Sequence, residues 1–377
     1  MSSLNFITIL GRQPELGLVE LESVLGAEVV RPFGSHAALI DQPIVVARYG
    51  GVIRVAEVLY RGPAVDARDL PIDIALLPMR ETKTPFAISL YGLKATRRYA
   101  EVVGLALKKR LKERGSVRLV EPRDGLTVSA AGLKHNRVLE QGFELIVVVS
   151  GQEMIVARTL GVQDVDAYAE RDYGRPARSA KVGMLPPKLA QILINTTHAG
   201  TVADPFCGTG VVLQEARLLG RVVTGSDLSP EMVAATQTNM QWLDGQQVDL
   251  PEVLNVAEAD ARQVHLPAET AVVSEGYLGT NQTNAPSEAA LADLRAELKP
   301  LYLDSLRNWA AQLASGADVA ICVPAWRVRG QWQYLDIVDE LANLGYTRKS
   351  FAHATTPLLY ARSDQVVGRQ LLLLRKN

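Results

Sequence analysis

Cysteine and histidine are scarce in this sequence. Its 377 residues include two cysteines, Cys207 and Cys322, and five histidines. None of them falls into a C-x-x-C or H-E-x-x-H spacing, so the sequence carries neither a disulfide framework nor a zinc signature. We therefore expect a reduced, cytoplasmic protein that binds no metal.

Long apolar runs are also missing. No stretch reaches the roughly 18 apolar residues that a membrane-spanning helix needs. The first residues lack the charged and apolar regions of a secretory signal. Hydrophobic residues make up 47% of the chain and charged residues 21%, as in an ordinary folded protein. We expect no membrane partner, and a chain of this length predicts two or three domains of roughly 150 residues.

Positive charge is concentrated in one segment, although the net charge of the chain is only −1. Twelve lysine and arginine residues lie between Lys94 and Arg137, against four acidic residues. Such a segment is typical of a phosphate-binding surface. A solvated helix over Tyr99 to Arg114 would have the same composition, so the residues alone leave both interpretations open.

The first 165 residues predict two α+β modules. The first contains a β-rich segment at Asn5 to Leu10, an amphipathic helix at Glu15 to Leu25, an extended segment at Ala27 to Ile40 and a helix at Ile44 to Leu59. The second contains a strand at Phe86 to Leu90, the basic helix, and strands at Val117 to Val120, Leu126 to Ala130 and Phe143 to Val149. A polar stretch around Gly174-Arg175-Pro176 predicts a linker.

The remaining chain alternates strands and helices, which predicts a parallel, doubly wound sheet. The expected strands are Thr201 to Asp204, Val222 to Asp227, Val253 to Ala257, Thr270 to Ser274 and Ala317 to Val323, with a closing antiparallel pair at Tyr346 to Ala354 and Gln370 to Leu374. The expected helices are Pro187 to Thr196, Val211 to Leu219, Pro230 to Leu243, Ser287 to Ala314 and Tyr334 to Leu344.

The motif Asp204-Pro205-Phe206-Cys207-Gly208-Thr209-Gly210 lies between an apolar strand and an apolar helix. Its glycines allow a tight turn and a close approach of the backbone to a ligand. Leu213 stands where a dinucleotide fingerprint would have its third glycine, and the P-loop pattern is absent. The loop therefore indicates a cofactor without a cradled pyrophosphate. Cys207 is expected to pack beneath the loop and not to act as a nucleophile.

Two acidic residues follow the next strands of the predicted sheet. Asp227 is positioned to accept hydrogen bonds from ribose hydroxyls, although Asp227 or Ser229 could instead cap the following helix. Asp260 is positioned to accept from an adenine amino group, or is simply a solvated loop acid. Together these residues favour an adenosine cofactor.

The catalytic half resembles the class I S-adenosylmethionine (SAM) methyltransferases. The D-P-F-C-G-T-G wording is similar to that of the THUMP-domain tRNA guanosine-N2 methyltransferases. The similarity extends upstream to Gly183-Met184-Leu185-Pro186-Pro187-Lys188-Leu189-Ala190 and downstream to Val367-Gly368-Arg369. It implies SAM as cofactor, bound by Asp204, Pro205, Phe206, Gly208, Thr209, Gly210, Asp227, Leu228, Asp260 and Ala261.

The resemblance also implies an architecture. The fold class is α/β, with a Rossmann-like methyltransferase sheet behind an amino-terminal α+β half. The expected domains are a ferredoxin-like domain (1–75), a THUMP-like RNA-binding domain (76–165), a linker (166–182) and the methyltransferase domain (183–377). It implies tRNA as the partner, contacted by Arg97, Arg98, Lys108, Lys109, Lys112, Lys134 and Arg137, whereas any accessory subunit is unknown.

One motif departs from the family. The fourth strand of the sheet ends there in D-P-P-Y, but here it runs into Ser274-Glu275-Gly276-Tyr277. An exocyclic amine attacks a methyl group only when acceptors hold its N–H groups, so we expect Glu275 to replace the missing aspartate, with Gly276 freeing the backbone to re-aim it. Tyr277 would stack on the base, and Ser274, Glu275 and Tyr277 form the predicted catalytic set.

Several alternatives stay open. The function predicted from the sequence is SAM-dependent methylation of tRNA at an exocyclic amine, most simply guanosine N2. A different methyl acceptor, a non-catalytic protein that binds tRNA and SAM, and a DNA amino-methyltransferase are the alternatives.

Overall fold

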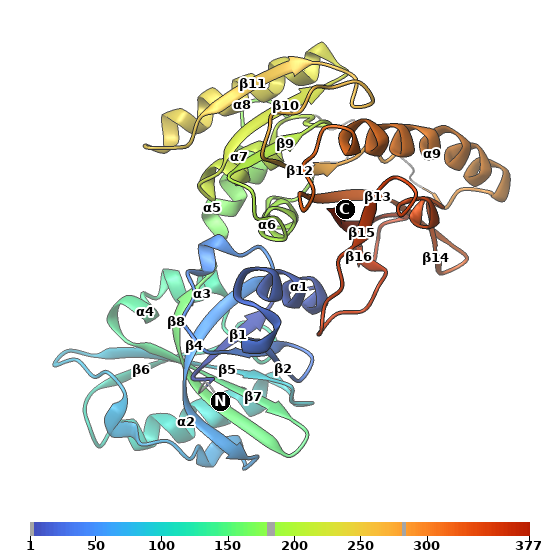
Figure 1. Cartoon of the computed structure of the whole chain (residues 1–377). Helices are drawn as coiled ribbons and strands as arrows, with labels where there is room; N and C mark the ends of the chain where they lie inside the picture. Colours follow the sequence, from blue (N-terminus) through green and yellow to red (C-terminus); the bar gives the residue numbers. More distant parts are fainter. Residues whose placement is uncertain (1–3, 179–184, 281–283) are drawn as a thin grey trace. The chain divides into compact units, whose positions relative to one another are not determined.

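A computed structural model describes residues 4–178, 185–280 and 284–377 of the chain. It divides at Ala167 into two compact units, residues 1–167 and 168–377. Gly183 and Met184 of the family-like segment, and residues 179–182 of the expected linker, lie outside the described residues. Each unit is described below by itself (Figure 1).

The described part of the first unit is built on one eight-stranded sheet. Its strand order is β2-β3-β1-β4-β8-β7-β5-β6. The strands are β1 (Phe6–Leu10), β2 (Arg31–Phe33), β3 (Ala37–Ile40), β4 (Val52–Pro63), β5 (Thr84–Tyr91), β6 (Val117–Val120), β7 (Phe143–Ser150) and β8 (Glu153–Val162). Pairing of β4 with β8 joins the strands of the two expected modules into a continuous sheet. The division of this unit into ferredoxin-like and THUMP-like domains stays a prediction.

The helix expected at Ile44 to Leu59 is wrong. The chain forms a short 3₁₀ turn at Val46–Arg48 and then the long strand β4. This strand lies between β1 and β8, and four of its first six positions, Val52–Glu57, hold buried or half-buried apolar residues. An apolar run covered on both faces lacks the strict alternation of a half-exposed strand, so periodicity does not separate it from a helix.

The helices of this unit are α1 (Pro14–Leu25), α2 (Arg97–Leu111), α3 (Ala130–His135) and α4 (Val138–Gln141).

The strand expected at Leu126 to Ala130 is wrong, because this segment is a loop that ends in the amino-terminal cap of α3. Ser89 Oγ accepts a hydrogen bond from the backbone N of Val128 at 2.9 Å. This loop is therefore held by individual hydrogen bonds and does not pair with a strand.

The second unit contains the predicted parallel sheet. Its order is β11-β10-β9-β12-β13-β17-β15, with β14 added to β13 and β16 to β17. The strands are β9 (Thr201–Asp204), β10 (Val222–Asp227), β11 (Val253–Glu258), β12 (Thr270–Glu275), β13 (Asp318–Val328), β14 (Gln331–Tyr334), β15 (Tyr346–Arg348), β16 (Leu358–Tyr360) and β17 (Val367–Lys376). The first five strands are parallel, and β17 runs antiparallel to both β13 and β15, which confirms the antiparallel closing pair.

The helices near the sheet are α6 (Pro187–Asn195), α7 (Val211–Leu218), α8 (Pro230–Gln246) and α9 (Glu288–Ala310), close to the predicted bounds. The helix expected at Tyr334 to Leu344 is wrong. That segment starts at the last residue of β14 and contains one 3₁₀ turn at Val338–Glu340, with Leu335, Ile337 and Leu341 buried in the core. The strand expected to reach Ala354 ends at Arg348.

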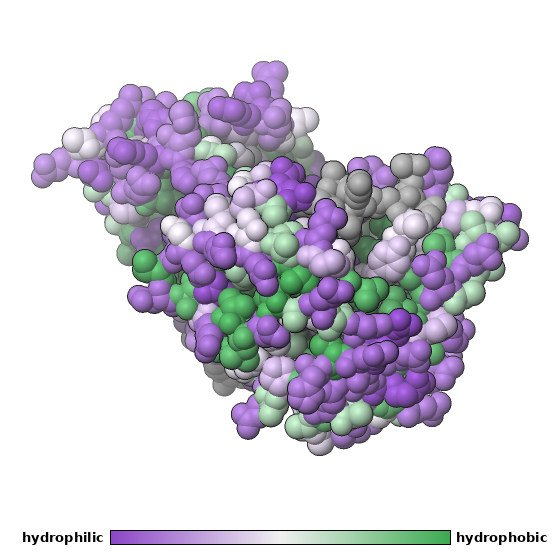
Figure 2. All heavy atoms as spheres, turned by 90° about the horizontal axis from the view of Figure 1, so that it is seen from above, coloured by the Kyte–Doolittle hydropathy of each residue, from purple (hydrophilic) through white to green (hydrophobic). Residues whose placement is uncertain are grey.

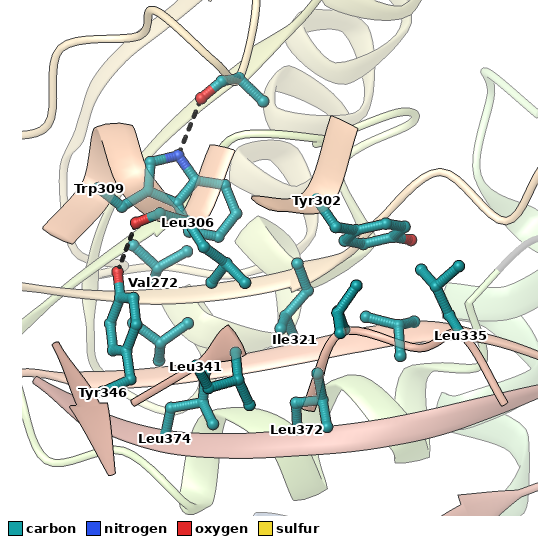
Figure 3. Close-up of a cluster of buried hydrophobic side chains, with 14 of the residues drawn as sticks. Val272, Tyr302, Leu306, Trp309, Ile321, Leu335, Leu341, Tyr346, Leu372 and Leu374 are labelled. Atoms are coloured by element: carbon teal, nitrogen blue, oxygen red, sulfur yellow. Dashed lines mark hydrogen bonds between the residues drawn. The ribbon is translucent and has the colours of Figure 1, made fainter. Parts of the chain in front are cut away.

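The core of the second unit lies between α9 and the sheet (Figure 3). Trp309 and Tyr346 are buried there, and each places its polar atom on a backbone carbonyl. Trp309 Nε1 donates to the Ala261 oxygen at 3.0 Å, and the Tyr346 hydroxyl donates to the Leu306 oxygen at 2.9 Å. Buried aromatic residues with satisfied polar atoms fix the position of α9 above β12 and β13.

The outer surface is largely hydrophilic on the face drawn in Figure 2, with hydrophobic patches among the polar groups. Within the described residues, no helix combines the length and the apolar character needed to cross a membrane.

Candidate active site

The candidate site lies at the carboxyl ends of the parallel strands. Strand β9 is flanked by β10 on one side and by β12 on the other, so the chain reverses its direction of winding at β9. Ligands of open α/β sheets bind in the crevice at such a point. The ends of β9, β10 and β12 bring Asp204, Asp227 and Glu275 to the same edge of the sheet.

The glycine loop after β9 has a fixed backbone. Gly208 and Gly210 have φ values of +52° and +82°, which favour glycine over other residues. The Gly210 nitrogen donates to the Cys207 oxygen at 2.7 Å, and the Thr236 hydroxyl donates to the Gly208 oxygen at 2.7 Å. A Cβ on Gly210 would lie 3.0 Å from Thr236, so a side chain would crowd α8.

Cys207 is buried beneath this loop. Burial raises the pKa of its thiol far above the ordinary range, and the nearby Asp204 carboxyl raises it further. A thiol that stays protonated is a poor nucleophile, in line with the packing role predicted for Cys207.

Asp227 connects the loop to the end of β10. Its Oδ2 accepts from the Gly208 nitrogen at 2.9 Å, and its Oδ1 accepts from the Ser229 nitrogen at 2.9 Å. Ser229 Oγ is the side chain that caps α8, accepting from the Met232 nitrogen at 3.4 Å. Each carboxylate oxygen has a second lone pair, so Asp227 keeps acceptor capacity for two ribose hydroxyls. Leu228 beside it is 68% exposed.

Asp260 has a charged neighbour in the structure. Both of its oxygens accept from the Arg262 side chain, with Arg262 Nη2 2.5 Å from Oδ2. Arg262 lowers the pKa of this carboxyl, which is therefore ionised. The role of Asp260 in binding adenine stays a prediction. Ala261 is buried, and its carbonyl is engaged by Trp309.

The predicted catalytic residues have different surroundings. Ser274 is buried and donates to Asp204 Oδ1 at 2.6 Å. Glu275 forms a buried ion pair with Arg369. Tyr277 is 40% exposed, so its ring is available for stacking. The structure thus brings the three residues to one strand end, with two of them engaged by the protein.

Gly276 has a different role from the one predicted. It does not lie in the left-handed region, so conformational freedom is not the reason for a glycine. An added Cβ would overlap the ring of Tyr302, whose hydroxyl donates to the Tyr277 oxygen at 2.9 Å. Gly276 therefore makes room for Tyr302, and Tyr302 holds the turn that directs Tyr277 outward.

Sequence reasoning missed the residues that hold the loop from behind. Arg175 falls within the predicted linker, but it is buried, and its Nη1 donates to Thr209 Oγ1 at 3.3 Å. Asn239 on α8 donates to the Thr209 oxygen at 2.8 Å and to the Ala177 oxygen at 2.9 Å. The segment between α5 (Val165–Ala169) and Arg178 thus packs against the cofactor loop. The arginines of this segment are the signal in the sequence that could have indicated its contact with the loop.

The seven predicted RNA-binding residues lie in the first unit and fall into two groups. Arg97, Lys134 and Arg137 form ion pairs with acidic residues. In the described ranges, Arg98, Lys108, Lys109 and Lys112 have no such partner. Three further arginines of the basic segment bind backbone carbonyls and are structural: Arg110, Arg114 and Arg118.

No group of three or more potential metal ligands occurs among the residues with described positions. This does not test the expectation that the protein binds no metal, which stays a prediction.

The strand order with its antiparallel β17 and the glycine loop define a Rossmann-like methyltransferase fold. The crystal structure of TrmN from Thermus thermophilus has this fold, with a TM-score of 0.56 over 99% of both chains and 18% sequence identity. No protein-family model matches the chain. The predicted fold class is confirmed.

Curated relatives give a more specific similarity. The chain is 27% identical to the tRNA (guanine(10)-N2)-dimethyltransferase of Methanothermobacter thermautotrophicus over 345 residues, which cover 87% of this chain and 89% of the relative. It is 28% identical to the Pyrococcus abyssi protein of the same name over 44% of this chain and 50% of that relative. The resemblance to tRNA guanine-N2 methyltransferases is therefore confirmed over most of the chain.

Proposed function

We propose that this chain is a SAM-dependent tRNA methyltransferase that methylates an exocyclic amine, with guanosine N2 as the acceptor. The observation that carries the proposal is the convergence of the glycine loop, Asp227 and the Ser274-Glu275-Gly276-Tyr277 segment at one edge of a Rossmann-like sheet. The similarity to curated tRNA methyltransferases over 87% of the chain supports tRNA as the substrate.

The residues at this edge fit SAM. Open space surrounds the position where Gly208 would carry a Cβ, so the loop leaves room for a ligand. Asp227 can accept from both ribose hydroxyls, and the exposed Leu228 offers an apolar surface for the adenine ring. Asp204, Pro205, Phe206, Thr209 and Gly210 shape the loop, and Asp260 with Ala261 completes the proposed adenine site.

The substrate base would be held by the end of β12. In our proposal, Glu275 accepts an N–H of the amine, so that the nitrogen lone pair points away from the ring plane and toward the methyl group. Tyr277 stacks on the base. When bound, SAM would supply an activated methyl group for transfer to the amine nitrogen; the amine would release one proton to water, and the cofactor would leave as a neutral thioether. The protein contributes orientation, worth several kcal/mol for two reactants held in near-attack geometry.

The first unit would position the RNA. We propose the ferredoxin-like (1–75) and THUMP-like (76–165) division for it, with the basic face of α2 contacting tRNA phosphates. Arg98, Lys108, Lys109 and Lys112 are the residues whose charge is uncompensated among the described contacts.

Because tRNA modification takes place where tRNA is found and both cysteines are free, we place the protein in the cytoplasm.

A second function is favoured by one specific observation. Ser274 and Glu275 are both engaged, by Asp204 and Arg369 respectively. A strand end at which both of these side chains already have protein partners would suit a protein that binds tRNA and SAM without methyl transfer.

Methylation of isolated nucleic acid separates these functions. Purified protein is incubated with methyl-labelled SAM and either unmodified total tRNA or duplex DNA, and the digested nucleosides are identified by mass spectrometry. We expect N2-methylguanosine from tRNA alone. Another methylated nucleoside would overturn the amine assignment, and methylated DNA would favour the DNA enzyme. Tight binding of SAM and tRNA without any transfer would establish the binding protein.

A further inference from the structure

Glu275 and Arg369 form a buried ion pair at the carboxyl edge of the sheet. Glu275 ends β12, and Arg369 lies on β17, with β13 between the two strands. Arg369 Nε donates to Glu275 Oε1 across this strand. The exposed fractions of the side chains are 14% for Glu275 and 5% for Arg369.

Only one of the two carboxylate oxygens is used in this contact. Within residues 4–178, 185–280 and 284–377, no donor to Glu275 Oε2 is found, and this oxygen is not among the polar atoms sealed inside the protein. Tyr277, two residues further along the chain, is 40% exposed. Glu275 therefore keeps a free acceptor oxygen at the end of β12.

We propose that Arg369 is a positioning residue that anchors Glu275 by Oε1 and thereby presents Oε2 to an N–H of the base amine. This inference rests on the proposed amine methylation at the same site. The base itself would touch Glu275 and not Arg369. An anchored carboxylate has one orientation, whereas an unanchored glutamate would sample several rotamers.

The charges around Glu275 explain why an arginine is needed. Burial raises the pKa of Glu275, and Arg369 lowers it. The other titratable groups that face the pair are Asp204, Tyr302 and Cys322 around Glu275, and Tyr360 beside Arg369. None of these is a cation, so among the described groups Arg369 alone opposes the rise that burial causes in the pKa of Glu275. Only an ionised carboxylate gives the amine a charge-assisted acceptor.

The same pair could instead be a structural brace between β12 and β17. The chain offers a matched control for that function. Lys349 and Asp318 form an ion pair with exposed fractions of 14% and 5% and an N–O distance of 3.0 Å. Asp318 begins β13, so this pair lies at the opposite end of the same parallel sheet. Asp318 also pairs with Arg375, at 3.4 Å. Lys349→Gln therefore measures the loss of the more buried of these two pairs, far from the site.

The test uses the full chain with the variants Arg369→Gln, Arg369→Lys, Glu275→Gln and Lys349→Gln. Single-turnover methylation of tRNA is followed from about pH 5 to pH 9, and binding of SAM and of tRNA is measured separately. We expect Arg369→Gln to lower the rate at neutral pH by about 10- to 100-fold, the equivalent of one hydrogen bond to a charged group. Binding of SAM should change less than about twofold, and Lys349→Gln should keep the wild-type rate.

The pH profile distinguishes positioning from bracing. Without Arg369 the pKa of Glu275 rises, so the acid limb of the rate profile should move to higher pH in Arg369→Gln and return toward the wild type in Arg369→Lys. Glu275→Gln should lack this limb. An unchanged rate and profile in Arg369→Gln would overturn the inference while leaving the methyltransferase proposal intact. If the wild type transfers no methyl group, the proposed function fails and this inference fails with it.

The double variant Glu275→Gln/Arg369→Gln covers the case in which Arg369→Gln does not fold, because it leaves no unpaired buried charge. Its rate should match that of Glu275→Gln alone, since Arg369 acts only through Glu275. A further loss in the double variant would also overturn the inference.

Discussion

Ser274 at the end of β12 donates a hydrogen bond to Asp204 at the end of β9, with 2.6 Å between Oγ and Oδ1. The same Asp204 oxygen accepts from the Phe206 nitrogen at 3.1 Å, inside the glycine loop. Both side chains are buried. One carboxyl group therefore joins the loop proposed to bind the cofactor to the strand end proposed to bind the base.

Asp204 should make the stability of the protein depend on pH. Burial raises its pKa from 3.8 to about 7, against the opposing effect of the hydrogen bond from Ser274. Between about pH 4 and pH 7 the folded state keeps a proton that the unfolded state has lost. The free energy of unfolding contributed by this group should therefore fall as the pH rises through this window, by up to about 1.4 kcal/mol per pH unit.

Asp204→Asn tests that dependence, because an amide does not titrate. Urea unfolding at pH 5, 6, 7 and 8 should show the stability of the variant, relative to the wild type, improving as the pH rises. Asp304→Asn, at an exposed ion pair on α9, serves as the control and should show no such trend. Parallel pH profiles for Asp204→Asn and the wild type would contradict the raised pKa.

Gly276→Ala should destabilise the protein through Tyr302. The added methyl group would overlap a fully buried ring, and overpacking of a core costs about 1 to 3 kcal/mol. Gly200→Ala is the matched control, because nothing lies within 4 Å of the corresponding Cβ. In a Tyr302→Leu background the cost of Gly276→Ala should shrink. Equal costs with and without the Tyr302 ring would show that backbone strain, and not crowding, explains the glycine.

The central elements of the second unit could be predicted because their signals are local. Strands β9 and β10 have the predicted bounds, since each is a short apolar run that ends at an aspartate and is followed by turn residues. The helices that follow begin at Val211 and Pro230 as expected. Local periodicity failed at β4, a strand that pairs with β1 and β8 and carries apolar residues on both faces.

The partners of the site residues could not be predicted, because they come from distant parts of the sequence. Arg369 is 94 residues from Glu275, and Ser274 is 70 residues from Asp204. Arg175 lies in a polar stretch, and only the folded chain shows that it is buried against Thr209. Sequence spacing indicates which residue types reach the edge of the sheet. It does not indicate which of their oxygens already accept hydrogen bonds within the protein.

Asp227→Ala should weaken SAM binding by about 1.5 to 3 kcal/mol, the range for hydrogen bonds to a charged group. Asp227 also accepts from the backbone nitrogens of Gly208 and Ser229, so some loss of stability is expected as well. Calorimetry measures the dissociation constant, and urea unfolding measures the stability. Ser229→Ala removes the helix cap alone and should lower stability without changing the dissociation constant. Unchanged SAM binding by Asp227→Ala would return this residue to a purely structural role.

Charge reversal on α2 should weaken tRNA binding and flatten its salt dependence. Lys108, Lys109 and Lys112 are free of ion pairs among the described contacts, so their charge is available to phosphates. The variant with glutamate at all three positions should lose up to roughly 0.7 to 0.9 logarithmic units of salt slope per lost phosphate contact. The sign-matched control reverses Lys299, Arg307 and Arg329, each of which is ion-paired in the second unit. If both triple variants lower the slope equally, net charge and not the face of α2 attracts the RNA.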